Sequence, residues 1–566
     1  MRCGLIPPAA RLVERTTFVA PLMEPCETVT VERSPSLNPE QRKADLAKMA
    51  AGGFDMVVIG GGVTGCGVAL DAASRGLSVA LVEQRDLASG TSSRSSKLIH
   101  GGLRYLEQLN FGLVREALAE RNLMLNRLCP HLVEPVSFLY PLKHRIWERM
   151  YVGAGILLYD VLARFADNPL PRHRHLTRKS ALELAPALQP ASLTGAVRYW
   201  DAMVDDARHT LAVARTAASR GALLATSTRV TGMVMDGDRV AGVVARDLES
   251  GRVLAIRARS VISATGVWTD DVQELAGDRG IDVVASKGIH LVLPKSAIDS
   301  DTGLILRTEK SVLFIIPWPE HWIIGTTDTL WSLRRAHPAA SLTDINYLLE
   351  RANSALKNPV RNEDIVGVYA GLRPLLTGES EETSRLSREH AVLESKSGLI
   401  SVAGGKYTTY RVMARDAVDQ ARKSLGFDVP DSATDRIQLV GADRPSVLER
   451  MCEGRPELRA KLGTSRFTRA EALFAVTDEG ALHLDDILTR RTRISVETED
   501  RGTVVAEEVA RLVAPSLGWT EGDVEREVAH YLARVEAERD SQTRADDETA
   551  DAARMGAPDV RLGGID

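Results

Sequence analysis

The chain has 566 residues, of which 44% are hydrophobic and 26% are charged, and its formal net charge is -5. This length suggests two or three domains, and the composition is typical of a folded protein. The weak negative charge excludes a general electrostatic attraction to nucleic acid. The odd number of cysteines and the lack of a CxxC pair argue against a disulfide framework or a metal site and fit a reducing cytoplasm: Cys3, Cys26, Cys66, Cys129 and Cys452.

The N-terminal residues show no strong pattern. Residues 1–50 mix Arg, Glu and Pro with short apolar pieces, without the continuous apolar core of a signal peptide, and we expect a flexible extension. No run of about 18 apolar residues occurs anywhere, so the sequence predicts no transmembrane helix.

The first motif with chemical meaning is a glycine-rich turn between a strand and a helix. Asp55-Met-Val-Val-Ile59 predicts a buried parallel strand, and Gly60-x-Gly62-x-x-Gly65 follows it directly. An apolar helix and a second strand ending at Glu83 complete a βαβ unit of ordinary size. In this fingerprint the glycines allow the turn and the approach of a pyrophosphate, and the acid binds ribose hydroxyls. We therefore predict a dinucleotide site, with an ordinary glycine-rich turn as the alternative.

Two later segments favour FAD over NAD as the dinucleotide. Ser260-Val-Ile-Ser-Ala-Thr-Gly266 resembles the second short motif of flavoproteins with two dinucleotide-binding domains, where backbone near Ala264 and Gly266 passes the cofactor. Gly404-Gly405 precedes a predicted helix start at Thr408, whose N–H groups could stabilise a reduced flavin anion. No second GxGxxG occurs, which argues against a separate NAD domain.

The rest of the chain divides by its periodicity. Residues 257–264 predict another strand, and 291–293, 312–316 and 322–324 predict strands of a mostly antiparallel sheet. From about Thr434 onward helical periodicity dominates, so we expect an all-helical C-terminal domain. The last stretch, 541–566, is rich in Asp, Arg, Ala and Gly and is expected to be disordered.

The most specific segment runs from Thr91 to Leu106 and reads TSSRSSKLIHGGLRYL. It resembles the aerobic, FAD-dependent, quinone-linked glycerol-3-phosphate dehydrogenases, and the similarity extends in order over roughly residues 54 to 535. One departure is Tyr407, where many relatives carry Leu; it affects packing and not the chemistry. Further segments carry the resemblance: VDDAR at 204–208, GTTD at 325–328, AGLRP at 370–374, GGKYTTYR at 404–411 and LDDILTRRTR at 484–493.

The resemblance implies an α/β flavoprotein (an α+β two-domain protein of the glycine-oxidase/glutathione-reductase type) with an all-α C-terminal domain. We expect an FAD-binding domain within 51–430, made of about 51–130, 200–285 and 364–430. A substrate-binding sheet would be inserted at about 131–199 and 286–363, and the helical domain would span 431–540. The implied reaction is hydride transfer from C2 of sn-glycerol 3-phosphate to flavin N5, giving dihydroxyacetone phosphate.

The resemblance also implies a substrate pocket beside the flavin. A phosphate dianion needs cationic groups, and an alcohol needs hydrogen bonds and a proton acceptor. We expect Arg104, Arg373 and Lys406 to hold and polarise the substrate, with Tyr105 donating a hydrogen bond. The proton acceptor is left open between His100, which should also contact the flavin, and His290. The remaining residues predicted to bind FAD are Ser92, Ser93, Lys97, Asp328 and Thr408, besides the glycines above; for Asp328 a turn-forming role is an equal alternative.

The electron acceptor raises the question of a membrane. Arg145–Asp160 is basic at its start and aromatic at both ends, too short to span a bilayer but suited to its interface; a buried core helix is the alternative. Because ubiquinone or menaquinone resides in lipid, we expect a peripheral protein on the inner, cytoplasmic face of the membrane. The sequence does not decide the oligomeric state, and a homodimer is among the states that it allows. Competing functions are an oxygen-reducing glycerol-3-phosphate oxidase, a soluble amine or amino-acid oxidase, and a non-catalytic nucleotide-binding protein.

Overall fold

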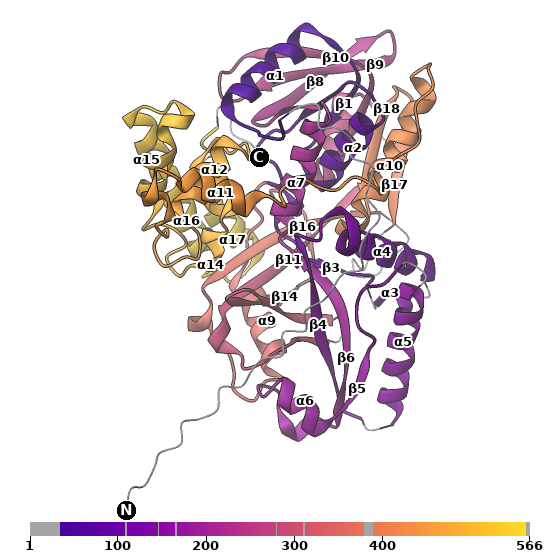
Figure 1. The fold of residues 1–566 in the computed structure, drawn as a ribbon, viewed down its shortest axis with the longest axis vertical. Coiled ribbons are helices and arrows are strands. Elements are labelled where there is room, and N and C mark those ends of the chain that lie inside the picture. The colour runs from indigo at the N-terminus through magenta and orange to yellow at the C-terminus, as the bar shows by residue number, and fades with distance from the viewer. Residues whose placement is uncertain are drawn as a thin grey trace, which may run out of the picture. The chain divides into compact units, whose positions relative to one another are not determined.

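The predicted βαβ unit is present in the computed structural model (Figure 1). Strand β1 (Gly53–Ile59) leads through the glycine turn into helix α2 (Val63–Ser74) and then into β2 (Val79–Val82), which pairs parallel with β1. The structure describes residues 34–102, 104–107, 110–144, 146–164, 167–278, 280–308, 312–377, 389–557 and 559–561, all within one unit that spans Glu32–Asp566.

The first sheet has eight strands and a parallel centre. Its order is β17-β18-β10-β1-β2-β7, where β18, β10, β1, β2 and β7 run parallel, and β9 and β8 extend it antiparallel from β10. Parallel neighbours end at the same edge of a sheet, so the segments that follow β1, β2, β10 and β18 begin side by side at that edge. The other strands are β7 (Leu223–Ala225), β8 (Thr228–Asp236), β9 (Arg239–Asp247), β10 (Val253–Ser263), β17 (His390–Glu394) and β18 (Leu399–Gly404).

Helices cover both faces of this parallel centre. On one face α2 packs against α7 (Asp206–Ser219) and α10 (Tyr410–Ala421), and their alanine-rich surfaces join the strands in the largest buried apolar cluster. On the other face a second apolar cluster includes Met49 of α1 (Pro39–Ala51) and Val272 of α8 (Thr269–Leu275). Small side chains allow these helices to lie close to the strands, which fixes the position of the glycine turn.

The second sheet has ten strands and is mostly antiparallel, as the sequence predicts. Its order is β15-β11-β14-β13-β12-β4-β6-β3, with β16 paired to β11 and β5 to β6; β12 and β4 are parallel. Helices α6 (Arg178–Leu184) and α9 (Leu342–Asn353) belong to the apolar cluster on one face, and α5 (Trp147–Arg164) to that on the other. The strands are β3 (Leu98–Ile99), β4 (Val133–Leu142), β5 (Arg174–Thr177), β6 (Gly195–Val204), β11 (Val283–Pro294), β12 (Gly303–Arg307), β13 (Val312–Trp318), β14 (His321–Gly325), β15 (Thr329–Trp331) and β16 (Gly367–Leu376).

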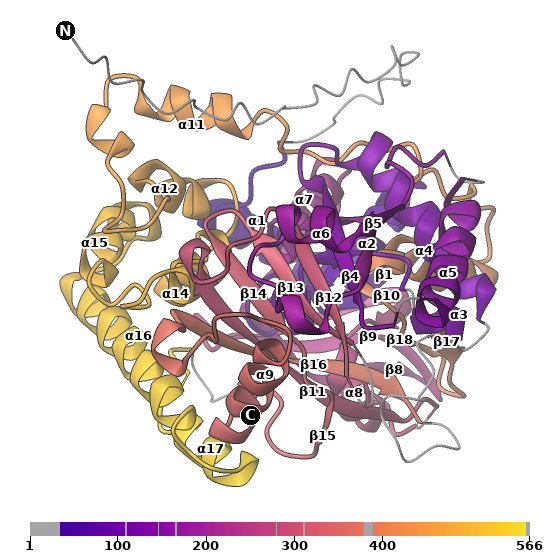
Figure 2. The ribbon, with the colours of Figure 1, turned by 90° about the horizontal axis from the view of Figure 1, so that it is seen from below.

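The C-terminal region is helical, which confirms the prediction from periodicity. Seen from below in Figure 2, α16 and α17 lie beside α9, whereas α5 lies on the other side of the second sheet. From Lys406 to Arg561 the described residues form helices, turns and loops, with two isolated β-bridges, Lys461 to Thr468 and Glu479 to Leu37. The helices are α11 (Arg444–Cys452), α12 (Arg469–Thr477), α13 (Leu484–Asp486), α14 (Ile494–Glu497), α15 (Ala506–Leu517), α16 (Glu521–Ser541) and α17 (Asp547–Arg554), with the π-helical turn η10 (Ile487–Arg491).

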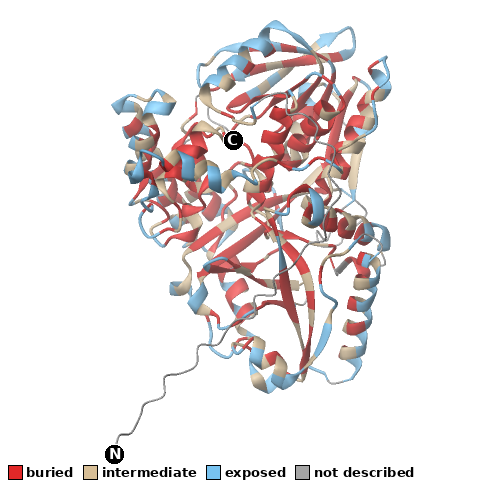
Figure 3. Cartoon of the chain, in the orientation of Figure 1, coloured by how far each residue is buried: buried red, intermediate tan, exposed pale blue. Residues whose placement is uncertain are grey.

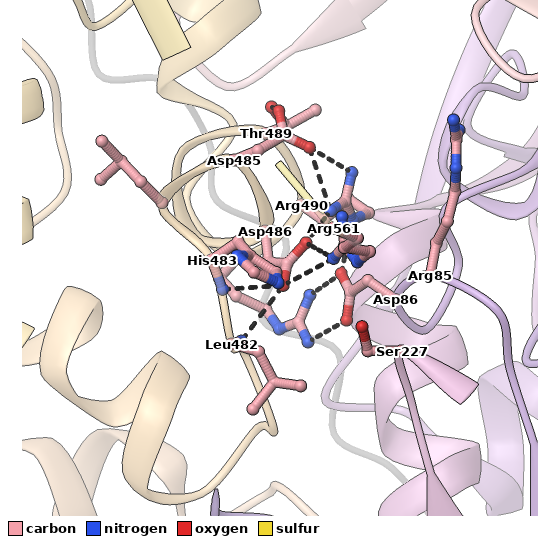
Figure 4. Close-up of polar contacts among 12 residues, drawn as sticks. Arg85, Asp86, Ser227, Leu482, His483, Asp485, Asp486, Thr489, Arg490 and Arg561 are labelled. Atoms are coloured by element: carbon pink, nitrogen blue, oxygen red, sulfur yellow. Dashed lines mark hydrogen bonds and ion pairs between the residues drawn. The ribbon is translucent and has the colours of Figure 1, made fainter. Parts of the chain in front are cut away.

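A buried ionic network joins these helices to the first sheet (Figure 4). Asp86, in the loop after β2, accepts a hydrogen bond of 2.5 Å from Arg490 Nε and two from Arg491, at 2.6 and 2.8 Å. Arg493 donates to the Ser93 carbonyl at 2.9 Å and to Asp205 at 2.7 Å. The family segment 484–493 therefore acts as a junction: its arginines neutralise carboxylates that would otherwise be buried without partners.

Both ends of the described chain are more ordered than we expected. The extension predicted over 1–50 includes α1, which Asn38 caps and whose buried Asp45 accepts a hydrogen bond from the Leu224 amide at 3.2 Å. Residues 1–33 lie outside the described residues. The tail predicted as disordered forms α17, where Asp547 pairs with the buried Lys287 at 2.5 Å. Composition alone missed these contacts because acidic and basic residues here pair with distant partners.

The proposed domain division and the two sheets differ at β3 and β16. β3 lies within 51–130, yet it pairs with β6 of the second sheet. β16 begins at Gly367, within the segment assigned to the FAD-binding domain, but pairs with β11 over ten residues and so belongs to the second sheet. It brings side chains of the 370–374 segment next to those of β11. Figure 3 shows the contrast between the buried strands and the largely exposed outer side of α5.

Candidate active site and cofactor cavity

A cavity of about 710 Å³ lies at the carboxyl ends of the parallel strands. It is lined at one end by the turn after β1 and the N-terminus of α2, and at the other by Gly404–Thr408 after β18 and by residues of β11 and β16. Ligands of open α/β sheets bind at this edge, outside the carboxyl ends of the strands. Most of the predicted cofactor and substrate residues therefore line one continuous space.

The glycine turn leaves no room for side chains. Gly60 has a φ of +112°, and a Cβ there would lie 2.6 Å from the Ala264 carbonyl oxygen of the neighbouring strand end. A Cβ on Gly65 would lie 2.0 Å from the Gly60 carbonyl oxygen. Gly62 is the N-cap of α2 and lines the cavity with Val63 and Thr64. The free N–H groups of this helix end suit a diphosphate.

Glu83 and Ser92 stand beside this helix end and line the cavity. Glu83 accepts hydrogen bonds from the Gly61 amide at 2.6 Å and the Arg85 amide at 2.8 Å. Burial raises the pKa of the Glu83 carboxyl, and these two hydrogen bonds oppose the effect. The Ser92 hydroxyl accepts a hydrogen bond from the Val63 amide at 2.9 Å. Glu83 lies where a ribose acceptor is expected, and Ser92 lies next to the phosphate end.

The opposite end of the cavity is cationic. Lys406 follows Gly404 and Gly405; its Nζ donates to the Gly101 carbonyl at 3.3 Å and lies 3.7 Å from the centre of the Tyr105 ring. Tyr105 belongs to the short helix α3 (Arg104–Glu107) and lines the cavity. Thr408 accepts a hydrogen bond from the His100 amide at 3.3 Å. The side chain of Arg104 lies outside the described residues.

Arg373 is held in place from behind. From β16 it donates to Thr326 Oγ1 at 3.0 Å and to the Thr327 carbonyl at 3.1 Å. Asp328 lies 3.5 Å from its Nη1 and also accepts a hydrogen bond from the Ser286 hydroxyl. Arg373 lines the cavity while Asp328 does not. In this geometry Asp328 supports Arg373 and lies outside the lining of the cavity.

Both candidate histidines line the cavity. His290, on β11, is stacked on Tyr369 with ring centres 4.7 Å apart, and its Nε2 lies 2.8 Å from the Ser96 hydroxyl. Burial, with Arg373 and Lys97 as secondary causes, lowers the pKa of His290 well below its ordinary value. The environment therefore favours the neutral imidazole, which keeps one ring nitrogen as a hydrogen-bond acceptor. His100 is half-buried and meets Phe314 edge to face, with ring centres 6.2 Å apart.

Two residues predicted to bind the cofactor lie behind the cavity wall instead. Lys97 Nζ donates to Asp206 at 2.6 Å and to the Ser93 carbonyl at 2.7 Å, and neither Lys97 nor Ser93 lines the cavity. Lys97 and Ser93 lie in the 91–106 segment, which suggested contact with the cofactor. Instead, the buried Asp206 accepts from Lys97, and Arg493 donates to the Ser93 carbonyl. The remaining predicted cofactor residues, Ala264 and Gly266, line the cavity beside Gly60.

Sequence reasoning missed three residues that support the site. Ser96 and Tyr369 hold His290 as described, and the Tyr369 hydroxyl donates to the Ser95 carbonyl at 3.0 Å. Ser96 lies within the 91–106 segment and Tyr369 directly precedes the 370–374 segment. Their place in or beside these family segments was the sequence feature that could have indicated a role in the site. Thr326 supports Arg373 in the same way. Tyr407, the departure from the family pattern, donates to the Asp206 carbonyl at 2.7 Å, a packing role.

FAD fits this arrangement on its geometry. Glycines replace side chains where a diphosphate would approach, a buried carboxyl lies at the ribose position, and the cavity continues to a second helix start at Gly404–Thr408. The family model for FAD-dependent oxidoreductases matches residues 55–411, more than half of the chain. The model for the C-terminal domain of alpha-glycerophosphate oxidase matches residues 437–524.

A relative of known name decides the family. Glycerol-3-phosphate dehydrogenase 2 of Mycobacterium tuberculosis is 53% identical over 560 residues, which cover 93% of this chain and 95% of the relative. The chain belongs to the FAD-dependent glycerol-3-phosphate dehydrogenase family. The X-ray structure of the glycerol-3-phosphate dehydrogenase from Bacillus halodurans complexed with FAD has a TM-score of 0.70 at 28% identity, covering 88% of this chain and 98% of that one.

A more distant structure confirms the fold. L-alpha-glycerophosphate oxidase from Mycoplasma pneumoniae with FAD bound has a TM-score of 0.54 at 16% identity, covering 69% of this chain and 99% of that one. The protein is thus an FAD-dependent oxidoreductase with mixed sheets and an all-helical C-terminal domain, as the sequence predicts.

Proposed function

We propose that this enzyme oxidises sn-glycerol 3-phosphate to dihydroxyacetone phosphate and passes the electrons to a membrane quinone. The observation that carries the substrate is the cationic end of the cavity, where Lys406, Tyr105 and Arg373 stand near two histidines. The name of the relative with 53% identity supports the same substrate. When bound, FAD supplies the acceptor for the hydride from C2 of the alcohol.

The roles of the side chains follow from their charge and support. Arg373 presents a planar donor fork that suits a phosphate, and its contacts with Thr326 and Asp328 fix its direction. Lys406 adds a point charge beside the Tyr105 ring. His290 is neutral, stacked and buried, so we propose it as the acceptor of the alcohol proton, with His100 as the alternative.

The exposed face of α5 supports a membrane-bound acceptor. Met150 is 72% exposed, Trp147 57% and Leu157 54%, and Ile146, directly before the helix, is 72% exposed. An apolar stripe of this kind on a helix is suited to the interface of a bilayer, where a quinone would be reached. Exposed basic residues lie shortly before α5, at its last position, and in the following segment that includes β5 and the start of α6: Lys143, Arg164, Arg172, Arg174, Arg178 and Lys179. None of the described helices combines the length and apolar character needed to cross a membrane.

The substrate is tested by anaerobic bleaching of the flavin spectrum. Glycerol 3-phosphate should bleach the wild-type enzyme within a turnover, whereas sn-glycerol 1-phosphate and glycerol should not. Lys406→Met should require much more substrate for the same bleaching. A flavin that stays oxidised with glycerol 3-phosphate but is bleached by an amine or an amino acid would contradict the proposal.

The acceptor is tested with anionic liposomes that contain a quinone. Trp147→Glu with Met150→Glu should abolish sedimentation with liposomes and slow quinone reduction, while a soluble dye is still reduced at the normal rate. Leu330→Glu with Val504→Glu is the matched control, since both residues are exposed and apolar but lie elsewhere. Stoichiometric peroxide in the presence of quinone would instead establish an oxygen-reducing oxidase.

A further inference from the structure

A second hollow lies behind the wall of the FAD cavity, where the C-terminal helices meet the two sheets. It has two lobes of about 70 and 20 Å³, which share Arg94, His337, Asp485, Arg534 and Arg554. Arg94 also lines the FAD cavity, so this residue borders both spaces. The mechanism proposed above uses none of the other residues.

The walls of this hollow carry an excess of positive charge. The residues lining each lobe include six Lys or Arg side chains and only two Asp or Glu side chains. The carboxylates are already engaged: Asp485 pairs with Arg490 and Arg534, and Glu538 lies 3.3 Å from both Arg501 and Arg554. Most of the other cations pair with carboxylates outside the hollow: Lys97 and Arg493 with Asp206, and Arg490 and Arg561 with Asp486. Arg94 has no carboxylate partner among the described residues, and Arg501 and Arg554 share one, so the wall can still accept a further anion.

Arg94 shows this imbalance most clearly. It forms no ion pair with any residue that the structure describes, and the charges that act on it are those of Arg85, Arg554 and Arg490, opposed by Glu538. Burial, and then these arginines, lower the pKa of Arg94 to about 9. The guanidinium of Arg85 points away from Asp86 in Figure 4 and donates to the Ala336 carbonyl at 3.0 Å.

Two further polar groups at the hollow have no partner in the described part of the chain. Arg85 Nη2 lies 2.9 Å from His337 Nε2. Because a guanidinium only donates, Nε2 accepts and the ring proton of the neutral imidazole is on Nδ1. That Nδ1 and the Ser495 hydroxyl are buried without a hydrogen-bond partner. Both residues line the larger lobe, so the hollow offers unused donors as well as charge.

We propose that this hollow is a binding site for a phosphoryl dianion, with Arg94, Arg534, Arg554 and His337 as donors. A volume of about 70 Å³ has room for roughly five water-sized groups, which matches the five heavy atoms of orthophosphate. Arginine forks are suited to such oxyanions, and a cation or an apolar ligand would leave the charges unbalanced. The bound dianion is either free phosphate or the phosphoryl group of a monoester, and the size of the hollow favours free phosphate.

The position of the site gives the anion a structural consequence. Arg94 belongs to the segment that borders FAD, whereas Arg534 and Arg554 belong to α16 and α17. An anion that binds all three joins the C-terminal helices to the wall of the cofactor cavity. Phosphate should therefore stabilise the holoenzyme and slow the loss of its FAD.

The first test measures thermal unfolding and FAD release of the holoenzyme, in phosphate, sulfate or chloride at equal ionic strength. All proteins carry Lys406→Met, which weakens any phosphate binding in the substrate pocket. Phosphate should raise the unfolding temperature by several degrees relative to chloride, and Arg94→Met and Arg554→Met should weaken its apparent affinity at least tenfold. Arg511→Met, an exposed arginine on α15, is the matched control and should keep the full response.

Without phosphate the variants give a second readout. Because Arg94→Met removes an unpaired buried charge, it should unfold at the same or a higher temperature than its parent in chloride. A response to glycerol 3-phosphate but not to phosphate would assign the site to a monoester. Crystals of the holoenzyme soaked in selenate should show an anomalous peak within the hollow. No such peak, together with an equal phosphate response in all variants, would overturn the proposal.

Discussion

His483 should make the stability of the protein depend on pH in the alkaline range. Its imidazole lies between two carboxylates, with Nδ1 2.9 Å from Glu527 of α16 and Nε2 2.9 Å from Glu249 of the first sheet's β9–β10 loop. Burial and Arg561 act to lower the pKa of His483, but the hydrogen bonds to these two carboxylates outweigh them and raise it to about 9. The charged ring therefore joins the C-terminal helices to the first sheet.

The size of the effect follows from the shift. An unfolded histidine has a pKa of about 6.5, so the difference of roughly 2.5 units corresponds to about 3 kcal/mol in the free energy of unfolding. Because the folded-state pKa is raised, this contribution is fully present below about pH 6.5 and is lost as the pH rises to about 9. Over that window the wild type should lose roughly 1.4 kcal/mol per pH unit from this group.

The assay is urea unfolding of the holoenzyme at several pH values, for the wild type and His483→Gln. The variant should be less stable at pH 6, and the difference between the two proteins should shrink by about 3 kcal/mol by pH 9.5. His144→Gln serves as a control because His144 is exposed in the bend before α5. A difference between wild type and His483→Gln that stays constant across the pH range would refute the reasoning.

Three further predictions concern the cavity. Gly65→Ala should yield protein with little bound FAD, since its Cβ would lie 2.0 Å from the Gly60 carbonyl oxygen; flavin absorbance after purification measures this. Lys406→Met should raise KM and lower kcat, and unchanged steady-state kinetics would show that Lys406 does not contact substrate. His290→Asn should lower kcat by two orders of magnitude or more and abolish the acid limb of the pH–rate profile, whereas His100→Asn should retain that limb; the opposite pattern would assign the proton acceptor to His100.

The sequence predicted the parts of the site that depend on local geometry. The turn after β1 and the acid after β2 are encoded within about thirty residues, where strand, glycine spacing and helix periodicity agree. Gly60 and Gly404–Lys406 line one cavity because β1, β10 and β18 are parallel neighbours, but the family resemblance was needed to see it. Arg373 and His290 meet because β16 pairs with β11, a long-range register that no local pattern specifies.

The errors have a common physical cause. Lys97, Ser93 and Asp328 were assigned to the cofactor because they lie in segments that otherwise line the cavity. Their side chains or carbonyls are instead bound by distant charged residues, such as Arg493 for the Ser93 carbonyl. The order of α17 was missed for the same reason. Which partner a charged side chain finds depends on chain segments hundreds of residues away, and composition does not record it.

The junction formed by Arg490, Arg491 and Arg493 has a consequence for the order in which the protein is made. The cofactor cavity is bordered by residues between Ile59 and Met413, yet the Asp86 carboxylate and Ser93 carbonyl behind its wall are satisfied by residues near position 490. A ribosome that has completed both sheets has therefore not yet supplied these partners. Durable capture of FAD should follow the emergence of the last helices, so a nascent chain released early would hold its cofactor weakly.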